Sequence, residues 1–301
     1  MIAVLLSTYN GEEFIKEQLD SLFFQSVKEF VLVVRDDGSS DNTLKILKDY
    51  AKKYENLILL PTNENLGIKK SFEILLNYAL NMKNIEFFMF CDQDDVWMKN
   101  KIEKSVQLIS DIKGPALGHT DLYVTDENLN VLHNSFWKYQ HINPSLNQLN
   151  RILLQNTVTG CSMIINRPLA EMFKVIPDEA IMHDWWFALH ASAFGEIKYL
   201  NEPTIYYRQH CKNDTGAKKY GMQYVLKKIR KQESGILDKN ILQAKKFYIL
   251  HREKLNFSQK SMLESFIALP GMNFFQKRLT LFKYRFFKYG FIRNLGLFLW
   301  I

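Results

Sequence analysis

The sequence predicts an α/β fold built on a mostly parallel β-sheet flanked by helices. Over residues 1–112, short apolar runs alternate with segments whose apolar residues recur at helical spacing, which is the pattern of βαβ units. A polar loop follows each apolar run, as expected where parallel strands end at the carboxyl edge of a sheet. With 301 residues, 47% of them hydrophobic, the chain is long enough to bury a large core.

Four strands and four helices are expected in this first part of the chain. The strands are Ile2–Ser7, Phe30–Arg35, Leu57–Pro61 and Phe87–Cys91. The helices are Glu12–Phe24, where Phe14, Leu19, Leu22 and Phe23 recur at helical spacing, then Asn42–Tyr54, Ile68–Met82 and Lys99–Ile112. Further along, we expect strands within Leu117–Val124 and over Gly160–Asn166, and a helix over Asp184–Phe194.

Charge divides the chain into two parts. Residues from Lys218 to Ile301 include 18 Lys and Arg against 4 Asp and Glu, a balance of +14, whereas residues 1–217 have a balance of −7. This change favours a boundary near Thr215–Gly216. We therefore expect one domain over residues 1–215, with halves at 1–112 and 113–215, and a basic, aromatic, helical extension over 216–301.

Cysteine usage and apolar run length exclude several classes of protein. The three cysteines are far apart and form no CxxC pair, which argues against a disulfide framework or a zinc knuckle and favours a reducing, cytoplasmic compartment. The opening MIAVLLSTYN lacks the basic leader and cleavage site of a signal peptide, so we interpret it as a buried strand. No stretch approaches the roughly 18 apolar residues of a membrane span.

The segment FMFCDQDDVW brings three acids together at the end of a buried strand. Crowded like charges repel, so a positive charge is expected beside them. Asp92 and Asp94, spaced as DxD, offer the oxygens that Mg²⁺ prefers, and Mg²⁺ commonly completes its shell with substrate phosphates. The simpler interpretation is a solvated acidic turn, but the position after a buried strand favours a metal with a diphosphate beyond it.

The segment RDDGSSD follows the second expected strand. Gly38 permits a sharp turn, and Ser39–Asp41 offer helix caps, so a plain strand-to-helix turn explains part of the pattern. It leaves Asp36 and Asp37 unexplained, and their carboxylates can accept hydrogen bonds from a base or from ribose hydroxyls. Neither GxxxxGK[ST] nor GxGxxG is present, so the site is not a P-loop or a dinucleotide fingerprint.

Four motifs in order, STYNGEEFIKEQLDSLFFQS, RDDGSSDNT, NENLG and DQDD, resemble those of family-2 glycosyltransferases with the GT-A fold. The resemblance covers about residues 1–215 and implies a nucleotide-diphospho-sugar donor, transfer with inversion, and Mg²⁺ or Mn²⁺ as cofactor. It makes 1–112 the nucleotide-sugar-binding half and 113–215 the acceptor half. Carried over by position, Thr8, Tyr9, Asn10, Glu12 and Gly67 line the nucleotide-sugar pocket, Asp36 or Asp37 binds the base, Asp92 binds ribose or diphosphate, and Asp94 binds the metal.

The second half, with QNTVTGCSMIINRPL, MHDWWFALHASAFG and YYRQHCKN, resembles the subgroup containing bacterial rhamnosyltransferases of surface-polysaccharide assembly. The resemblance makes Asp184 the catalytic base, because an inverting transfer needs a carboxylate to take the acceptor's proton. Many relatives have Glu-Asp where this chain has His183-Asp184. The QxxRW motif of processive members is replaced by Trp185-Trp186, which favours addition of a single sugar.

Several of these residues also have simpler interpretations. Asp184 could only cap its helix, and Trp185 and Trp186 could belong to the core instead of stacking on an acceptor sugar. His210 resembles a histidine that completes the metal or diphosphate site in some GT-A enzymes, but a lone histidine is more often structural. Arg208 could contact the diphosphate or pair with a carboxylate.

The basic extension mixes Phe, Leu, Tyr and Trp with Lys and Arg, which suits the anionic inner face of the plasma membrane, where a lipid-linked or oligosaccharide acceptor would lie. Packing onto the catalytic domain or in a homodimer is the alternative, and no motif supports nucleic-acid binding. Other functional classes are a sugar-nucleotide nucleotidyltransferase, which the acidic STYNGEE loop disfavours, and a non-catalytic sugar-nucleotide scaffold. The sequence does not fix the sugar, and the resemblance leans to dTDP-rhamnose over a UDP-sugar.

Overall fold

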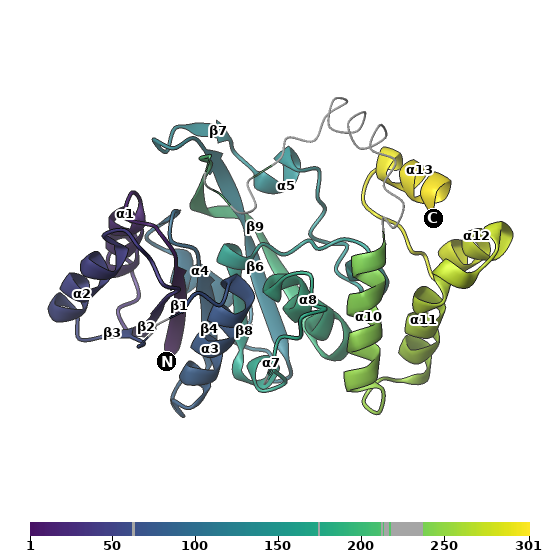
Figure 1. The fold of residues 1–301 in the computed structure, drawn as a ribbon, viewed down its shortest axis with the longest axis horizontal. Helices are drawn as coiled ribbons and strands as arrows, with labels where there is room; N and C mark the ends of the chain where they lie inside the picture. Colours follow the sequence, from purple (N-terminus) through teal and green to yellow (C-terminus); the bar gives the residue numbers. More distant parts are fainter. Residues whose placement is uncertain (62–63, 174, 212, 214–216, 218–236) are drawn as a thin grey trace. The chain divides into compact units, whose positions relative to one another are not determined.

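The computed structural model describes the chain except for residues 62–63, 174, 212, 214–216 and 218–236 (Figure 1). The chain divides into two compact units. The first contains Met1–Phe136, Val158–Ile176 and Gly195–Ala217, and the second contains Trp137–Thr157, Pro177–Phe194 and Lys218–Ile301. The expected boundary at Thr215–Gly216 lies outside the described residues, and the domain division drawn from the sequence stays a prediction.

The first unit holds the whole β-sheet. Its strands are β1 (Ile2–Thr8), β2 (Phe30–Asp36), β3 (Leu57–Leu59), β4 (Phe87–Cys91), β5 (Val96–Trp97), β6 (Ala116–Thr125), β7 (Val131–His133), β8 (Met163–Asn166) and β9 (Glu196–Arg208). The strand order is β3-β2-β1-β4-β8-β6-β9-β5, with β7 paired to β6. The pairs among β1 to β4, and the pair β6–β9, are parallel, whereas β8, β5 and β7 pair antiparallel with their neighbours.

The central strands are buried on both faces, which explains their continuous apolar sequences. Residues Ala3–Leu6 of β1 and Phe88–Cys91 of β4 have no exposed surface. The parallel register pairs Ile2 with Phe30 and carries through to Thr8 opposite Asp36. The loops that follow β1 and β2 therefore leave the sheet at the same level, and the polar residues of these loops meet there.

Helices of the first unit cover this sheet. They are α1 (Ile15–Phe23), α2 (Thr43–Lys53), α3 (Ile68–Leu80), α4 (Lys101–Gln107) and α7 (Arg167–Ala170), with a single 3₁₀ turn η1 (Gly160–Ser162) before β8. Helix α3 packs against β1 and β2, α4 against β6 and β8, α2 against β3, and α1 against β5. The expected α/β fold with a C-terminal helical part is confirmed, although several helices are shorter than expected.

The second unit is helical. It contains α6 (Leu149–Ile152), α8 (His183–Phe194), α10 (Asp238–His251), α11 (Phe257–Ile267), η2 (Leu269–Gly271), α12 (Phe274–Lys283) and α13 (Phe291–Trp300), while α5 (Phe136–Tyr139) spans the passage between the units. Asn256 and Asn273 form capping boxes with Gln259 and Gln276 at the starts of α11 and α12, which satisfy the first backbone N–H groups of both helices. None of the helices in the described residues combines the length and apolar character needed to cross a membrane.

A histidine pair lies in the aromatic core of the second unit. His190 on α8 is buried, and its Nδ1 lies 2.8 Å from the Trp186 carbonyl while its Nε2 lies 2.7 Å from His251 Nε2. Because a carbonyl only accepts, Nδ1 of neutral His190 must donate, and His251 must then donate to His190 Nε2. Phe247 packs against both rings, with centroids 4.8 Å and 4.9 Å away.

We predict that this pair makes the protein acid-sensitive. Burial, and secondarily Lys254, lowers the pKa of His251 to about 4, and burial together with His251 holds the pKa of His190 well below its usual range. The unfolded chain takes up these protons near pH 6.5, so stability should fall as pH drops from about 6.5 towards 4. Burial lowers the pKa values of His119 and His183 to about 3, which adds a contribution of the same sign.

Thermal unfolding followed at about pH 7 and about pH 5 checks this prediction. In His251→Gln the amide can still donate to His190 but cannot take up a proton, so the difference between the two melting temperatures should shrink. An unchanged difference in the variant would contradict the role of the pair.

Candidate active site

Thr8 and Asp36 join the ends of β1 and β2. Both residues are buried, and the Thr8 hydroxyl donates to Asp36 Oδ1 over 3.0 Å. Asp36 also accepts from the backbone N–H of Ser39 at 2.9 Å and from the Ser39 hydroxyl at 2.5 Å. Gly38, between them, has a φ of 82°, which an L-residue with a side chain rarely adopts. The turn after β2 is therefore fixed by the carboxylate that begins it.

Asp37 connects the same turn to the loop after β3. Its carboxylate pairs with the buried Arg35 guanidinium and accepts from the backbone N–H groups of Leu66, at 2.9 Å, and Gly67, at 2.8 Å. Gly67 has a φ of 77° and precedes α3. In the described part of this loop, NENLG thus supplies backbone donors to a carboxylate of the neighbouring loop.

The loop after β1 interlocks with the loop after β2. Asn10, in the left-handed region with a φ of 49°, accepts through Oδ1 from the Ser40 backbone N–H at 2.8 Å. Glu12 accepts from the backbone N–H and the side-chain amide of Asn42, at 2.9 Å and 2.8 Å. Tyr9, Asn10 and Glu12 are exposed. These residues line an accessible edge of the site.

Gln93, the middle residue of the DxD motif, joins the acidic loop to the loop after β1. Its Oε1 accepts from the Tyr9 backbone N–H at 2.8 Å, and its Nε2 donates to the Tyr9 carbonyl at 2.9 Å. A Cβ atom on Gly11 would lie 2.4 Å from Gln93 Oε1. Glycine is therefore required at position 11 while Gln93 holds this position. The sequence interpretation assigned no role to Gln93, because a spacer residue in a short motif carries no local signal.

Asp94 and His210 come together in the first unit. Asp94 Oδ2 lies 2.8 Å from His210 Nε2 and 3.3 Å from Asn213 Nδ2. The ring of Phe14 packs on the His210 ring with centroids 4.7 Å apart. Two residues that the resemblance places at the metal site are thus neighbours in space, although 116 positions apart in the sequence. Asn213 joins this group without having been expected.

Arg208 is buried at the end of β9, and its guanidinium is directed to protein acceptors. Nε donates to the Asp94 carbonyl at 2.8 Å, and the terminal nitrogens contact the Glu127 carbonyl and the Glu17 carboxylate. The guanidinium also lies 4.4 Å from the centre of the Phe14 ring. Of the two roles expected for Arg208, pairing with a carboxylate is present in the structure.

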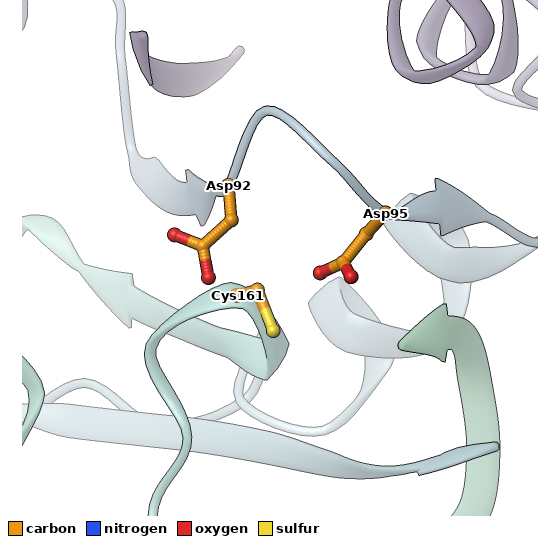
Figure 2. Close-up of side chains that lie close together, drawn as sticks. All are labelled: Asp92, Asp95 and Cys161. Atoms are coloured by element: carbon orange, nitrogen blue, oxygen red, sulfur yellow. The ribbon is translucent and has the colours of Figure 1, made fainter. Parts of the chain in front are cut away.

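Asp95 is the last residue of the acidic loop before β5, and its side chain is directed towards Cys161 (Figure 2). Oxygens of Asp92 and Asp95 and the Cys161 sulfur all lie within 4.8 Å of one another. Asp95 is fully buried and accepts from the Arg208 backbone N–H at 3.1 Å. Burial, followed by the charges of Asp94 and Asp92, raises the pKa of Asp95 well above its usual value.

Lys101 is a buried cation that interacts electrostatically with Asp95. It is fully buried, with Nζ 3.3 Å from the Ser162 carbonyl, 3.5 Å from the Ser105 hydroxyl and 5.0 Å from the centre of the Trp97 ring. Burial lowers its pKa to about 8, and Asp95 acts in the opposite direction. Lys101 is therefore still mainly charged at neutral pH, and its charge interacts favourably with the ionised form of Asp95.

Two groups of side chains could hold a dication, and their chemistry differs. Asp92, Asp95 and Cys161 are close together, but burial raises the pKa of the Cys161 thiol well above its usual value, and a neutral thiol is a poor ligand for a hard cation. Asp94 and His210, with Asp92 two residues earlier on the same loop, offer carboxylate oxygens, which suit Mn²⁺ or Mg²⁺, and one imidazole nitrogen. The residues present fit a metal at the second group.

The expected catalytic base belongs to the second unit. Asp184 lies in the first turn of α8, half-buried, and its Oδ1 accepts from the Trp185 backbone N–H at 2.5 Å. Trp185 is half-buried and donates through its indole N–H to the Ile152 carbonyl at 2.6 Å. Trp186 is buried in the core beside Phe247, with ring centroids 5.7 Å apart.

The sheet order and the polar loops at its carboxyl edge match the GT-A fold class. The chain resembles Staphylococcus aureus TarS residues 1–349 in complex with UDP-GlcNAc, with a TM-score of 0.60 and 19% identity over 94% of this chain and 80% of that one. It also resembles the mannosyltransferase PcManGT from Pyrobaculum calidifontis in complex with GDP-Man and Mn²⁺, with a TM-score of 0.55 and 17% identity over 93% and 72% of the two chains. These similarities establish the fold.

The sequence model of glycosyl transferase family 2 matches residues 3–173. The chain therefore belongs to glycosyl transferase family 2 and is a glycosyltransferase. Among its relatives is the dTDP-rhamnosyl transferase RfbG of Shigella flexneri, which is 28% identical over 223 residues, 70% of this chain and 74% of the relative. The family membership expected from the four motifs is confirmed.

We predict that Gly11→Ala disturbs the site through Gln93. The added Cβ would overlap the Gln93 amide, so the variant should lose about 1–3 kcal/mol of stability. Gln93→Ala removes both hydrogen bonds to Tyr9, at about 0.5–1.5 kcal/mol each, but it also removes the overlap. Chemical denaturation should show that the double variant is no less stable than Gln93→Ala alone. If the stability losses of Gly11→Ala and Gln93→Ala add up in the double variant, the clash does not involve Gln93.

We also predict that Lys101 and Asp95 are coupled. Lys101→Met removes the cation beside a buried carboxyl and should cost about 3 kcal/mol. Asp95→Asn removes the charge that Lys101 offsets, so the two substitutions together should cost at least about 1 kcal/mol less than the sum of their separate costs. A double-mutant cycle by urea denaturation measures this coupling, and strict additivity would contradict it.

Proposed function

We propose that the protein is a metal-dependent, inverting glycosyltransferase that moves one sugar from a nucleotide-diphospho-sugar to a lipid-linked or oligosaccharide acceptor in bacterial surface-polysaccharide synthesis. The observation that supports this most directly is the set of joined polar loops at the carboxyl edge of the sheet, with Asp94 and His210 2.8 Å apart beside them. Ligands of open α/β sheets bind at this edge.

The nucleotide pocket is proposed at the loops after β1, β2 and β3. Tyr9, Asn10 and Glu12 are exposed there, while Thr8, Asp36, Asp37 and Gly67 fix the loops around them. Among the described residues, Oδ2 of Asp36 and Oδ2 of Asp37 each accept one hydrogen bond. A carboxylate oxygen has two lone pairs, so each retains one for a base N–H or a ribose hydroxyl.

Asp94 and His210 are proposed to hold Mg²⁺ or Mn²⁺, and Asp92 is proposed to face the ribose or diphosphate. When bound, the metal would neutralise charge on the departing diphosphate. Arg208 is proposed to contribute by holding the acidic loop, because it donates to the Asp94 carbonyl and pairs with Glu17.

Asp184 is the proposed base. In an inverting transfer, its carboxylate takes the proton from the acceptor hydroxyl as that oxygen bonds to the anomeric carbon, and the bond from this carbon to the diphosphate breaks. The half-buried Trp185 remains available for stacking on an acceptor sugar, whereas the ring of Trp186 is packed in the core.

The relatives guide the choice of donor. One is a dTDP-rhamnosyl transferase, and the solved structures of similar fold carry UDP-GlcNAc or GDP-Man. We propose dTDP-rhamnose or a UDP-sugar as the donor, and transfer at the cytoplasmic face of the plasma membrane, which the C-terminal helices contact.

A donor panel tests this proposal. Thermal shifts measured with dTDP-rhamnose, UDP-sugars and GDP-mannose, with and without Mn²⁺ or Mg²⁺, should show one donor that stabilises the protein only with the metal. Asp94→Asn should abolish this metal-dependent shift.

Asp184→Asn provides the complementary variant. It should retain the shift with the donor and lower turnover by at least about a thousandfold, because the base is lost while the donor site is intact. Stabilisation by nucleoside triphosphates alone would favour a nucleotidyltransferase. Unchanged turnover in Asp184→Asn would remove Asp184 as the base.

A further inference from the structure

The last two helices carry a concentration of exposed apolar side chains. We call these residues the α12–α13 surface: Phe274, Phe275, Leu279 and Phe282 on α12, and Phe291, Ile292, Leu295 and Leu299 on α13. Phe275 is 76% exposed and Phe291 is 81% exposed. On each helix the residues recur at i, i+1, i+4 or i+5, and i+8, which places them along one face. Single exposed apolar residues are ordinary, but a contiguous face on a helix marks an interaction site.

These faces are exposed although both helices are well anchored. Leu281 and Leu297 are fully or almost fully buried, and Phe282 contacts Phe298 with ring centroids 5.3 Å apart. The Arg278 guanidinium lies 3.6 Å from the centre of the Phe274 ring and donates to the Phe298 carbonyl. One side of each helix thus packs against the protein, and another side exposes the residues of the α12–α13 surface.

The segment that carries this surface has charged residues of a single sign. Residues 265–301 include no Asp or Glu and six Lys or Arg, at positions 277, 278, 283, 285, 288 and 293. Lys283 and Arg285 are exposed between the two helices in sequence. Apolar side chains combined with cations and no acids are typical of helices that lie in the interface of an anionic bilayer.

A second copy of the chain is a poorer occupant. A two-fold dimer brings the same surface of both copies together, so the cations of one copy would face those of the other with no acid in the segment to offset them. Anionic lipid headgroups supply the missing negative charge, and the acyl boundary takes up the apolar side chains. Charge complementarity therefore favours an anionic membrane over a second copy of the chain as the occupant of this surface.

We propose that the α12–α13 surface docks the protein on anionic phospholipid, with the Phe and Leu side chains inserted at the headgroup boundary and Lys283 and Arg285 at the lipid phosphates. This rests on the membrane contact in the proposed function and identifies the residues that make it. Docking there would restrict the search for a lipid-linked acceptor to the plane of the membrane.

Sedimentation of the full chain with vesicles tests the proposal. Vesicles of phosphatidylcholine with about one third phosphatidylglycerol should bind the protein much more tightly than pure phosphatidylcholine vesicles. The double variant Phe275→Ser/Phe291→Ser should lower this affinity at least about tenfold. Lys283→Gln should lower the affinity for anionic vesicles about fivefold. In the parent protein, added salt should weaken vesicle binding, because salt screens the attraction between the cations and the lipid phosphates.

The matched control is Leu132→Ser on β7, which removes a side chain 56% exposed in the first unit and should leave vesicle binding unchanged. The donor-induced thermal shift of Phe275→Ser/Phe291→Ser should equal that of the parent protein, which shows that the variant is folded and separates this test from that of the donor site.

Three results would overturn the proposal. They are equal binding to neutral and anionic vesicles, vesicle binding that the double substitution does not change, and a dimer in analytical ultracentrifugation that the double substitution dissociates while no vesicles are bound.

Discussion

The candidate site depends on the connection between the end of β9 and the acidic loop after β4. The backbone N–H of Arg208 donates to the buried Asp95, and the Arg208 side chain returns to the Asp94 carbonyl. One contact is made to Asp95 and the other to Asp94, so together they fix this part of the loop relative to β9. His210 follows Arg208 by two residues, so its meeting with Asp94 Oδ2 is a consequence of this connection. The end of β9, which is far from the acidic loop in the sequence, therefore helps to hold that loop in place.

This connection also explains how three acids are tolerated at the end of a buried strand. The sequence led us to expect a metal as the compensating charge. The structure contains protein cations as well, because Lys101 interacts electrostatically with Asp95 and the Arg208 guanidinium donates to the Asp94 carbonyl. Asp95 is the most deeply buried of the three acids, and its hydrogen-bond partners are the Arg208 backbone N–H and Cys161. The need for a dication is therefore concentrated on Asp92 and Asp94, which are only partly buried.

The sequence predicted the strands that are buried on both faces most accurately. The run Phe87–Cys91 was placed with the observed ends, and Ile2–Thr8 and Phe30–Asp36 each extend one residue further than expected. Strand β9 was not predicted, because Glu196–Arg208 mixes exposed charges with a proline and is buried mainly towards its C-terminal end. Helix α4 is much shorter than the periodicity suggested, since it ends at Gln107.

The sequence also predicted part of the candidate site. Motifs indicated the loops that meet, because the carboxyl ends of parallel strands share an edge. Gln93, Asn213 and Lys101 escaped notice because their roles come from contacts between positions far apart in the sequence. Nothing in a local pattern distinguishes a spacer glutamine that binds another loop's backbone from one that faces water, and a buried lysine has the same local pattern as a solvated one.

The aromatic residues of the C-terminal helices fall into two subsets, which bear on the choice that the sequence left open between packing on the protein and facing a membrane. Phe247, Phe266 and Phe286 are fully buried, and Phe266 packs on Phe286 with centroids 5.1 Å apart. Phe274, Phe275 and Phe291 are largely exposed. Packing on the protein accounts for the buried subset, and the proposed membrane contact concerns the exposed subset. Phe275 and Phe291 are 76% and 81% exposed, so most of their apolar surface stays in contact with water in the protein alone. Their position in a segment with cations and no acids fits the proposed docking on an anionic surface.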